Sequence, residues 1–234
     1  MHLGVIAAGD GLRLKEEGIT EPKPLIKVLG KTLLERVLII AENYGFDTCN
    51  IIINEKFREE IEKSSILENR ENVKINCIFK STPSSLHSLY ELKSFLSDGS
   101  FCLMTIDSIF IESEFDEFIK QVKEEKNIDG LIAVTRFVDD EKPLWVRVDK
   151  NNRILGFNSF KDGSEYVTGG VYYFKRGIIE YTEDALSKNI FRLRNFLQYL
   201  IEMGMNLKAV PFSKIIDVDH KKDLIEAEKF LKQA

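Results

Sequence analysis

The alternation of short apolar runs with longer stretches of helical spacing constrains the fold of this chain more than any other feature. Residues 3–8 form a continuous apolar run, as expected for a strand that is buried on both faces. Residues 32–44 instead place apolar residues such as Leu34, Val37 and Leu38 on one helical face. Repeated strand–helix alternation of this kind predicts a parallel sheet with helices on both of its faces.

The same pattern extends over the whole chain. It predicts further strands at 49–53, 73–79, 101–106 and 130–135, and further helices at 56–63, 85–96 and 113–125. After about residue 136 it predicts strands at 144–148, 154–159 and 167–174, which suggest an antiparallel ribbon added to the sheet, then helices near 177–187 and 191–203, a strand at 207–211 and a helix at 221–232. No stretch has the composition of a linker. We therefore expect a single α/β domain over residues 1–234, with an N-terminal half (1–136) and a C-terminal half (137–234).

The charge balance and the apolar runs argue against several classes of protein. The chain has 33 Lys and Arg residues against 38 Asp and Glu residues, whereas a general nucleic-acid binder shows a basic excess. No apolar run approaches the roughly 20 residues of a membrane span, and the first residues do not resemble a signal peptide. We therefore expect a cytoplasmic protein that binds neither nucleic acid nor membrane. Cys49, Cys77 and Cys102 are expected to be buried, reduced thiols.

The polar loop predicted at 9–21, directly after the first strand, carries the most informative residues. Gly9 and Gly11 lack side chains, so their backbone N–H groups can approach a triphosphate closely. Arg13 offers a planar guanidinium to phosphate oxygens, and Lys23, held between two prolines, offers a point charge. The carboxyl end of such a strand is also where an open α/β sheet binds its ligand. The pattern indicates a phosphate-binding loop, and the alternative is an ordinary glycine turn with surface charges.

Acidic residues follow two later apolar stretches. Asp107 stands at the end of a predicted strand, where a buried acid is costly unless a cation or donor meets it. Strand-end acids often ligate Mg²⁺ beside substrate phosphates. Asp217 and Asp219 are two positions apart, so in an extended segment both side chains project to the same side. The alternatives are that Asp107 caps a turn and that Asp219 is the N-cap of the last helix.

A longer pattern surrounds the glycine loop and runs from Gly4 to Leu34. It reads G-V-I-A-A-G-x-G-x-R and then K-P-L-I-x-V-x-G-K-x-L-L. This pattern resembles the signature of the nucleotidyltransferases, which include sugar-1-phosphate nucleotidylyltransferases and bacterial phosphocholine cytidylyltransferases. The chain departs from the signature at Leu12, where the family usually has Ser or Thr.

The resemblance implies a fold, an activity and a division of labour. The fold would be a Rossmann-like three-layer sandwich, with a nucleotide-binding N-terminal half and an acceptor-binding C-terminal half. The activity would be the Mg²⁺-dependent transfer of a nucleoside monophosphate from an NTP to a phosphorylated small molecule, with release of pyrophosphate. Nucleotide-sugar biosynthesis is a process that uses this reaction.

The resemblance also implies roles for individual residues. Arg13 and Lys23 would be catalytic. Asp107 would ligate Mg²⁺ together with one of the two later acids, for which Asp219 is the first choice and Asp217 the second. The nucleotide-binding residues would be Ala7, Ala8, Gly9, Gly11, Thr82, Ser84 and Ser85.

Three further likenesses bear on the substrates. Residues 85–89, which read Ser-Leu-His-Ser-Leu, resemble the Asn-Ile-Tyr-Ser-Leu of phosphocholine cytidylyltransferases, and this favours CTP as the donor. Lys161 falls where sugar-phosphate enzymes carry Glu-Lys-Pro. Gly170 lies in a stretch that resembles the Asn-x-Gly-Ile-Tyr of the acceptor-side strand. The resemblance therefore places Lys161 and Gly170 at the acceptor.

Two other functions are compatible with parts of the pattern. A nucleotide-sugar glycosyltransferase shares the parallel sheet and uses a D-x-D metal motif, such as the one that Asp217 and Asp219 supply. A non-catalytic nucleotide-binding module would explain the departures at Leu12 and at Ile106, where the family usually has Gly. Release of pyrophosphate from NTP plus an acceptor separates nucleotidyl transfer from both.

Overall fold

A computed structural model describes residues 1–68, 70 and 72–233. Its strands are β1 (His2–Ala7), β2 (Lys27–Val28), β3 (Lys31–Thr32), β4 (Thr48–Ile53), β5 (Lys74–Phe79), β6 (Phe101–Thr105), β7 (Ser108–Ile109), β8 (Gly130–Thr135), β9 (Trp145–Val148), β10 (Ile154–Asn158), β11 (Tyr166–Phe174), β12 (Leu207–Phe212) and β13 (Ile216–Asp217). Its helices are α1 (Leu12–Glu16), α2 (Leu33–Asn43), α3 (Arg58–Lys63), α4 (Ser85–Glu91), α5 (Lys93–Leu96), α6 (Glu112–Glu124), α7 (Tyr181–Ser187), α8 (Leu193–Glu202) and α9 (Lys221–Gln233), with short 3-10 helices η1 (Lys23–Leu25), η2 (Glu55–Phe57) and η3 (Ile178–Glu180). None of these described helices is both long and apolar enough to cross a membrane.

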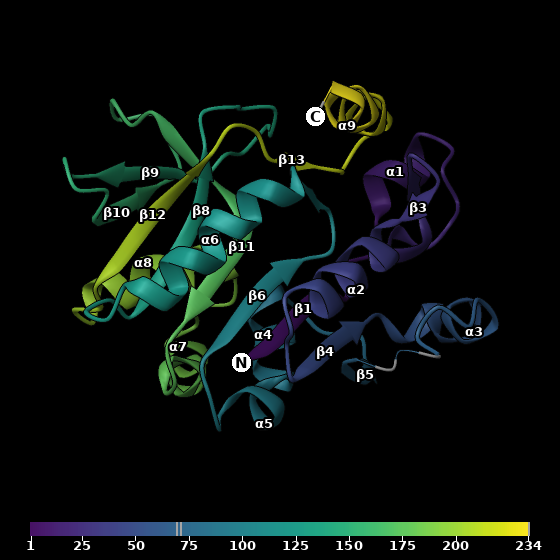
Figure 1. Ribbon diagram of the computed structural model, residues 1–234, viewed down its shortest axis with the longest axis horizontal. Helices are drawn as coiled ribbons and strands as arrows, with labels where there is room; N and C mark the ends of the chain where they lie inside the picture. Colours follow the sequence, from purple (N-terminus) through teal and green to yellow (C-terminus); the bar gives the residue numbers. More distant parts are fainter. Residues whose placement is uncertain (69, 71, 234) are drawn as a thin grey trace.

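Nine of the described strands form one central sheet (Figure 1). Seven of them follow the order β10-β9-β11-β6-β1-β4-β5, while β8 pairs with β11 and β12 pairs with β8. Strands β5, β4, β1 and β6 pair in parallel, and so do β8 and β12. Because β11 is antiparallel to β6, β8 and β9, and β10 is antiparallel to β9, only β10 and β11 in this sheet run against the common direction. The predicted α/β fold with a mostly parallel sheet is confirmed.

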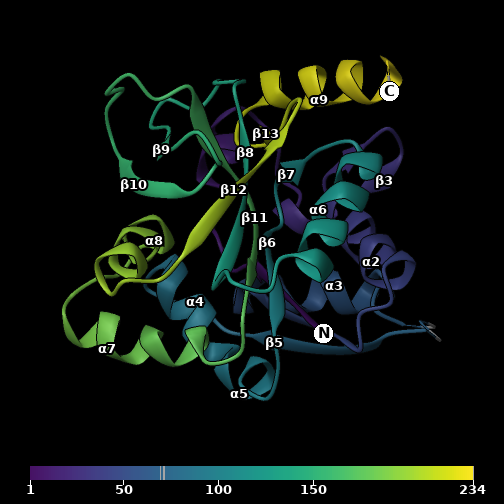
Figure 2. The ribbon, with the colours of Figure 1, turned by 60° about the vertical axis from the view of Figure 1, so that its left-hand side comes forward.

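The side chains of β1 explain why helices cover both faces of the sheet. Leu3 and Val5 lie in one buried core with apolar residues of α2 and α6. Ile6 points to the opposite face and packs in a second core with apolar residues of α4 and α8. Figure 2 shows the two helical layers on opposite sides of the sheet. A strand that is apolar on both faces therefore requires three layers.

The structure differs from the prediction in the place of β11. The sequence suggests that residues 167–174 belong to an antiparallel ribbon added to the sheet, and β9 and β10 do form such a hairpin. β11, however, lies inside the sheet between β6 and β8. From Gly169 to Phe174 every residue of β11 is buried, so both of its faces need cover and an edge position would expose them.

The predicted loop at 9–21 is partly helical. Gly11 adopts φ 63°, in the left-handed region, and the short helix α1 begins directly after it. Leu14 of α1 is 2% exposed and packs into the core, which anchors this helical turn. The predicted helix at 85–96 is likewise divided, into α4 and α5, where the N–H of Leu92 bonds to the carbonyl of Leu89 in a tighter 3-10 turn.

The three cysteines are free thiols on neighbouring strands of the sheet. Cys49 in β4 and Cys102 in β6 are fully buried on either side of β1, as the sequence predicts, and Cys77 in β5 is half-buried. Burial raises the pKa of both the Cys49 and the Cys77 thiols to about 12. Burial also raises the pKa of the Cys102 thiol.

The carboxyl ends of β1 and β6 open onto the same edge of the sheet because these strands are parallel neighbours. Asp107 lies two residues after the end of β6. The short strand β13 pairs antiparallel with β7, which places Asp217 opposite Ser108. The N–H of Val218 donates to the carbonyl of Asp107 at 3.1 Å. The topology thus brings acids that are far apart in the sequence to one edge.

Candidate active site

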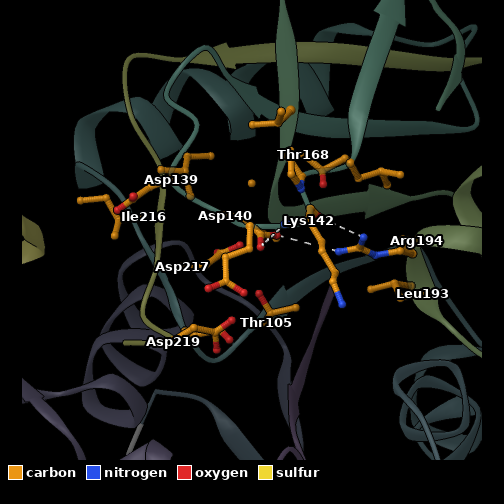
Figure 3. Close-up of a pocket in the computed structure, with 18 of the residues that line it drawn as sticks. Thr105, Asp139, Asp140, Lys142, Thr168, Leu193, Arg194, Ile216, Asp217 and Asp219 are labelled. Atoms are coloured by element: carbon orange, nitrogen blue, oxygen red, sulfur yellow. Dashed lines mark hydrogen bonds and ion pairs between the residues drawn. The ribbon is translucent and has the colours of Figure 1, made fainter. Parts of the chain in front are cut away.

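A cavity of about 570 Å³ opens at this edge of the sheet, and both halves of the chain line it. The N-terminal half contributes residues that include Arg13, Ser84, Ser85 and Asp107. The C-terminal half contributes the segments 137–144, 168–170, 192–194 and 215–217, together with Asp219. Figure 3 shows Asp217 and Asp219 on one side of the cavity and Arg194 on the other. The cavity therefore has an acidic side and a basic side.

Behind the acidic side a buried lysine, which does not itself line the cavity, lies between two carboxylates that do. Lys23 is 9% exposed and lies in η1. Its Nζ lies 2.5 Å from Oδ2 of Asp107 and 2.6 Å from Oδ1 of Asp219. The second oxygen of Asp219 accepts a hydrogen bond from Nη1 of Arg13 at 2.7 Å. Four predicted site residues, Arg13, Lys23, Asp107 and Asp219, are thus in direct contact.

The charges of this cluster determine its ionisation. Burial alone would lower the pKa of Lys23, but the charges of Asp107 and Asp219 raise it above the ordinary value. Burial would raise the pKa of Asp107, but the adjacent ammonium of Lys23 holds it below its ordinary value. Among the described residues no ion pair of this kind is formed by Asp217, and burial together with the negative charge of Asp107 raises its pKa to about 7. Asp107 is therefore an ionised carboxylate at neutral pH.

Asp219 is free to serve this cluster because another acid caps the last helix. The backbone N–H groups of Asp219 and His220 donate to Oδ2 of Asp223, at 2.9 and 2.6 Å. The Asp219 side chain instead contacts Lys23 and Arg13. Asp217 accepts a hydrogen bond from the Ser108 hydroxyl at 3.1 Å.

The donor set fits a metal ion that also binds phosphate. The shared contact with the Lys23 ammonium places one oxygen of Asp107 and one of Asp219 around a single cation. Mg²⁺ prefers oxygen donors and commonly takes one or two carboxylates plus substrate phosphates. Across the described residues, no group of three or more His, Cys, Asp or Glu side chains is arranged to hold an ion. A metal held by these two carboxylates would complete its coordination with a bound phosphate.

The predicted phosphate loop lies next to this cluster. Of Ala7, Ala8, Gly9, Gly11 and Arg13, only Arg13 is among the residues that line the cavity, and the other four are not. The Ala8 carbonyl accepts a hydrogen bond from the Asn54 amide at 3.0 Å, which fixes the end of β1. A side chain at Gly9 would meet open space, so a ligand can approach the backbone there.

The hydroxyls of Thr82, Ser84 and Ser85, which are predicted to bind the nucleotide, bond to the protein itself. The hydroxyls of Thr82 and Ser88 lie 2.6 Å apart. Ser84 donates to the carbonyl of Phe191, and Ser85 accepts a hydrogen bond from the N–H of Leu193 at 2.9 Å. Ser84 and Ser85 line the cavity, whereas Thr82 does not.

The two residues predicted at the acceptor lie in different places. Lys161 is exposed, places its Nζ 5.1 Å from the ring centroid of Trp145, and is not among the residues lining the cavity. Gly170 does line it, with φ 71°. A Cβ at Gly170 would collide with the hydroxyls of Ser108 and Thr105, so glycine is needed there for close packing.

The basic side of the cavity consists of residues that the sequence analysis did not identify. Arg194 donates from Nη1 to the Lys142 carbonyl at 2.9 Å, and its Nη2 lies 3.9 Å from Oδ2 of Asp140. Arg192 and Lys142 also line the cavity. No motif surrounds these residues. In the sequence, this side of the cavity is marked by the pair of arginines that flanks Leu193 at the start of a predicted helix.

Comparison with known families identifies the chain. The family model described as nucleotidyl transferase matches residues 4–234. The chain belongs to the nucleotidyl transferase family. This confirms the resemblance seen in the sequence.

Curated relatives of this nucleotidyl transferase are longer proteins. A bifunctional protein GlmU of Methanococcus maripaludis (strain C5) is 23% identical over 232 residues, which cover 95% of this chain and 52% of the relative. A bifunctional IPC transferase and DIPP synthase of Aquifex aeolicus is 25% identical over 238 residues, which cover 97% and 51%. The chain therefore spans about half the length of the curated relatives it matches.

Solved structures share the fold of the nucleotidyl transferase chain over its full length. An inositol-1-phosphate CTP transferase from T. maritima gives a TM-score of 0.80 at 22% identity and covers 100% of this chain and 96% of its own. A putative glucose-1-phosphate thymidylyltransferase from Bacillus anthracis gives a TM-score of 0.86 at 14% identity, with the same coverage. The predicted Rossmann-like nucleotidyltransferase fold is confirmed.

Proposed function

We propose that this chain transfers a nucleoside monophosphate from an NTP to the phosphate of a small molecule, with release of pyrophosphate. An oxygen of the acceptor phosphate attacks the α-phosphorus in line, and the bond from that phosphorus to the β-phosphate oxygen breaks. The acceptor's second phosphate pKa is about 6, so it is largely a dianion at neutral pH and needs no general base. The protein must supply alignment and positive charge.

The observation that carries the proposal is the cluster around Lys23. A buried ammonium and an arginine converge with two carboxylates at the carboxyl end of the parallel strands, where α/β sheets bind ligands. Membership of the nucleotidyl transferase family supports the same activity. No nucleophilic side chain is required, because the acceptor itself attacks.

Each member of the cluster has a role in this reaction. Arg13 presents a planar guanidinium that suits two phosphate oxygens and would hold the triphosphate. Lys23 would stabilise the charge that grows on the α-phosphate and the leaving pyrophosphate. Asp107 and Asp219 would hold Mg²⁺, which when bound supplies Lewis-acid stabilisation of the same charge. The backbone of Ala7, Ala8, Gly9 and Gly11 would lie against the nucleotide.

The acceptor would bind on the basic side of the cavity. Arg194, Arg192 and Lys142 line this side and would meet the acceptor phosphate, while Gly170 keeps the facing strand close. Lys161, which the sequence places at the acceptor, is engaged with Trp145 instead. The names of similar proteins include inositol-1-phosphate, glucose-1-phosphate and mannose-1-phosphate transferases, which supports a sugar or inositol phosphate as the acceptor class.

CTP is the proposed donor. The likeness of residues 85–89 to phosphocholine cytidylyltransferases supports it, and so does the similarity in fold to an inositol-1-phosphate CTP transferase. The hydroxyls of Ser84 and Ser85 are engaged within the protein, so the base would be read mainly by backbone groups of this segment.

The experiment is a matrix of donors and acceptors read by pyrophosphate release. CTP, UTP, dTTP and GTP are each combined with glucose 1-phosphate, mannose 1-phosphate, inositol 1-phosphate and phosphocholine, with Mg²⁺ and with EDTA. We expect release that requires an acceptor, an NTP and Mg²⁺, with CTP preferred by about tenfold, or roughly 1.4 kcal/mol.

Each part of the proposal fails separately. If another NTP exceeds CTP by tenfold, the cytidylyl assignment is wrong while nucleotidyl transfer stands. If the chain binds NTP without turnover, it is a binding module. If the chain releases no pyrophosphate in this matrix but releases a nucleoside diphosphate when it is given a nucleotide-sugar, it is a glycosyltransferase.

A further inference from the structure

Two serines that line the cavity, Ser84 and Ser85, make hydrogen bonds to residues outside their own helix. Ser84 occupies the N-cap position of α4, where a serine usually accepts a bond from its own helix, but its side chain makes no such cap. Helix α8 begins after Arg192, whose side chain also supplies no cap. Both helix starts therefore depend on other partners.

The two helix starts bond to each other. Ser84 donates to the carbonyl of Phe191, and the N–H of Leu86 donates to the same carbonyl at 3.0 Å. The first N–H of α8, that of Leu193, donates to Oγ of Ser85 at 2.9 Å across 108 positions of sequence. Ser85 thus caps a helix of the other half of the molecule.

A histidine completes this contact. The single hydroxyl proton of Ser84 goes to the Phe191 carbonyl, so the 2.8 Å contact with Nδ1 of His87 requires that His87 donates. The His87 ring stacks on Phe191 with centroids 5.6 Å apart and an angle of 25°. The segment before α8 is therefore held by backbone, hydroxyl and aromatic contacts together.

The residues that this contact holds are next to the basic side of the cavity. Leu193 is 5% exposed and anchors the start of α8. Arg192 and Arg194 stand on either side of it, and both line the cavity. A shift of the α8 start would move both guanidinium groups.

We propose that Ser84 and Ser85 are positioning residues for the acceptor phosphate, because they fix the start of α8 and with it Arg192 and Arg194. This inference rests on the proposed function, which assigns the acceptor phosphate to those arginines. The two serines lie in the half of the chain that is predicted to bind the nucleotide, but this role would serve the acceptor. A nucleotide base that binds against Ser84 and Ser85 would contact the same two serines that hold Arg192 and Arg194 beside the acceptor phosphate.

The test compares Ser85→Ala with Ser85→Thr, which keeps a hydroxyl for the Leu193 N–H. Ser84→Ala is the second variant, and Ser94→Ala, an exposed serine of α5, is the matched control. Two quantities are measured: the KM values for the acceptor and for the NTP that give turnover in the matrix above, and amide hydrogen exchange across residues 191–196 of the free protein.

We expect Ser85→Ala to raise the acceptor KM about tenfold, with the NTP KM unchanged within about twofold, and to speed exchange at residues 191–196. Ser85→Thr and Ser94→Ala should stay near the starting protein in both measurements. Unchanged exchange, or a rise in both KM values together, would overturn the inference. Hydrogen exchange can be measured without substrate. If the chain transfers no nucleotide, the proposed function is wrong, but the effect of Ser85→Ala on exchange at residues 191–196 can still be tested.

Discussion

The two halves of the molecule contribute residues to the same site in different ways. The N-terminal half supplies Arg13 and Lys23 from one short stretch after β1, and Asp107 from the end of the parallel neighbour β6. The C-terminal half supplies four separate segments that meet only through long-range pairing and packing. Arg13, Lys23 and Asp107 are thus each marked by their neighbours in the sequence, whereas the proposed acceptor site of the second half depends on how distant segments are held.

This contrast predicts different consequences of substitution in the two halves. Changes of Arg13, Lys23 or Asp107 in the N-terminal half should act mainly on turnover and on the balance of buried charge. Changes in the C-terminal half should act on packing and on the acceptor KM. Four substitutions test the contrast, from the largest expected effect to the smallest.

Asp107→Asn should lower kcat by about 10³-fold, because one charge of the metal-binding pair and one partner of Lys23 are lost together. The steady-state rate of pyrophosphate release at saturating substrates measures this effect. Asp98→Asn, a substitution of an exposed acid that pairs with His2, is the control. Normal turnover of Asp107→Asn at ordinary Mg²⁺ concentrations would show that Asp107 is not a metal ligand.

Lys23→Met should destabilise the metal-free protein by roughly 3 kcal/mol, because it leaves the carboxylate of Asp107 without its cation and that of Asp219 with Arg13 alone. Mg²⁺ should restore more stability to this variant than to the starting protein. Turnover should also fall by more than NTP affinity, since the ammonium matters most as pyrophosphate leaves. Urea unfolding with and without Mg²⁺, and calorimetric titration of NTP, measure these quantities.

Two further variants separate charge from packing at Lys23. Lys27→Met removes an exposed lysine nearby and should change neither stability nor the response to Mg²⁺. Lys23→Met combined with Asp219→Asn should recover part of the lost stability, because one of the two facing charges is gone. A Lys23→Met protein as stable as the starting protein, with no added response to Mg²⁺, would show that the contact carries no energy.

Gly170→Ala should destabilise the protein by about 2 kcal/mol, because the new Cβ meets the hydroxyls of Ser108 and Thr105 at a positive φ. Gly163→Ala is the matched control: its φ is also positive, at 90°, but its Cβ meets open space. Denaturant midpoints for the two variants isolate the cost of the collision. If both variants lose the same stability, backbone strain at positive φ accounts for the whole effect of Gly170→Ala.

Arg194→Ala should raise the acceptor KM about tenfold with little change in the NTP KM. Lys161→Ala should change the acceptor KM by less than about twofold, because Lys161 lies on Trp145 and outside the cavity lining. Initial rates over a range of acceptor concentrations decide between the two. If Lys161→Ala has the larger effect, the alignment with the family's Glu-Lys-Pro motif is the better guide than the structure.

The sequence was sufficient for the features that short-range patterns determine. The apolar run of β1, the charges of Arg13 and Lys23 and the strand-end Asp107 are each readable within a few residues, and the structure brings all three side chains into one cluster with Asp219. Their placement follows from parallel strands sharing a carboxyl edge.

The features that the sequence did not reveal depend on long-range geometry. The bonding of Ser85 to Leu193 joins positions 108 apart, and Arg194 owes its place to that contact and to the Lys142 carbonyl. The interior position of β11 depends on cover from both cores. No local pattern encodes a partner that arrives from another element. The sequence therefore predicts Ser85 only as a nucleotide-binding residue, does not identify Arg194, and places β11 in an added ribbon.

Thiol-directed reagents should find little to react with in this chain. The thiolate is the reactive form of cysteine, and burial keeps the pKa of Cys49 and Cys77 near 12, far above the pH of a labelling reaction. A single cysteine introduced at Leu12, which is 61% exposed and adjacent to Arg13, would therefore be the preferred site of attachment for a fluorophore. The three native cysteines could remain in place, and the dye would report on nucleotide arriving beside Arg13.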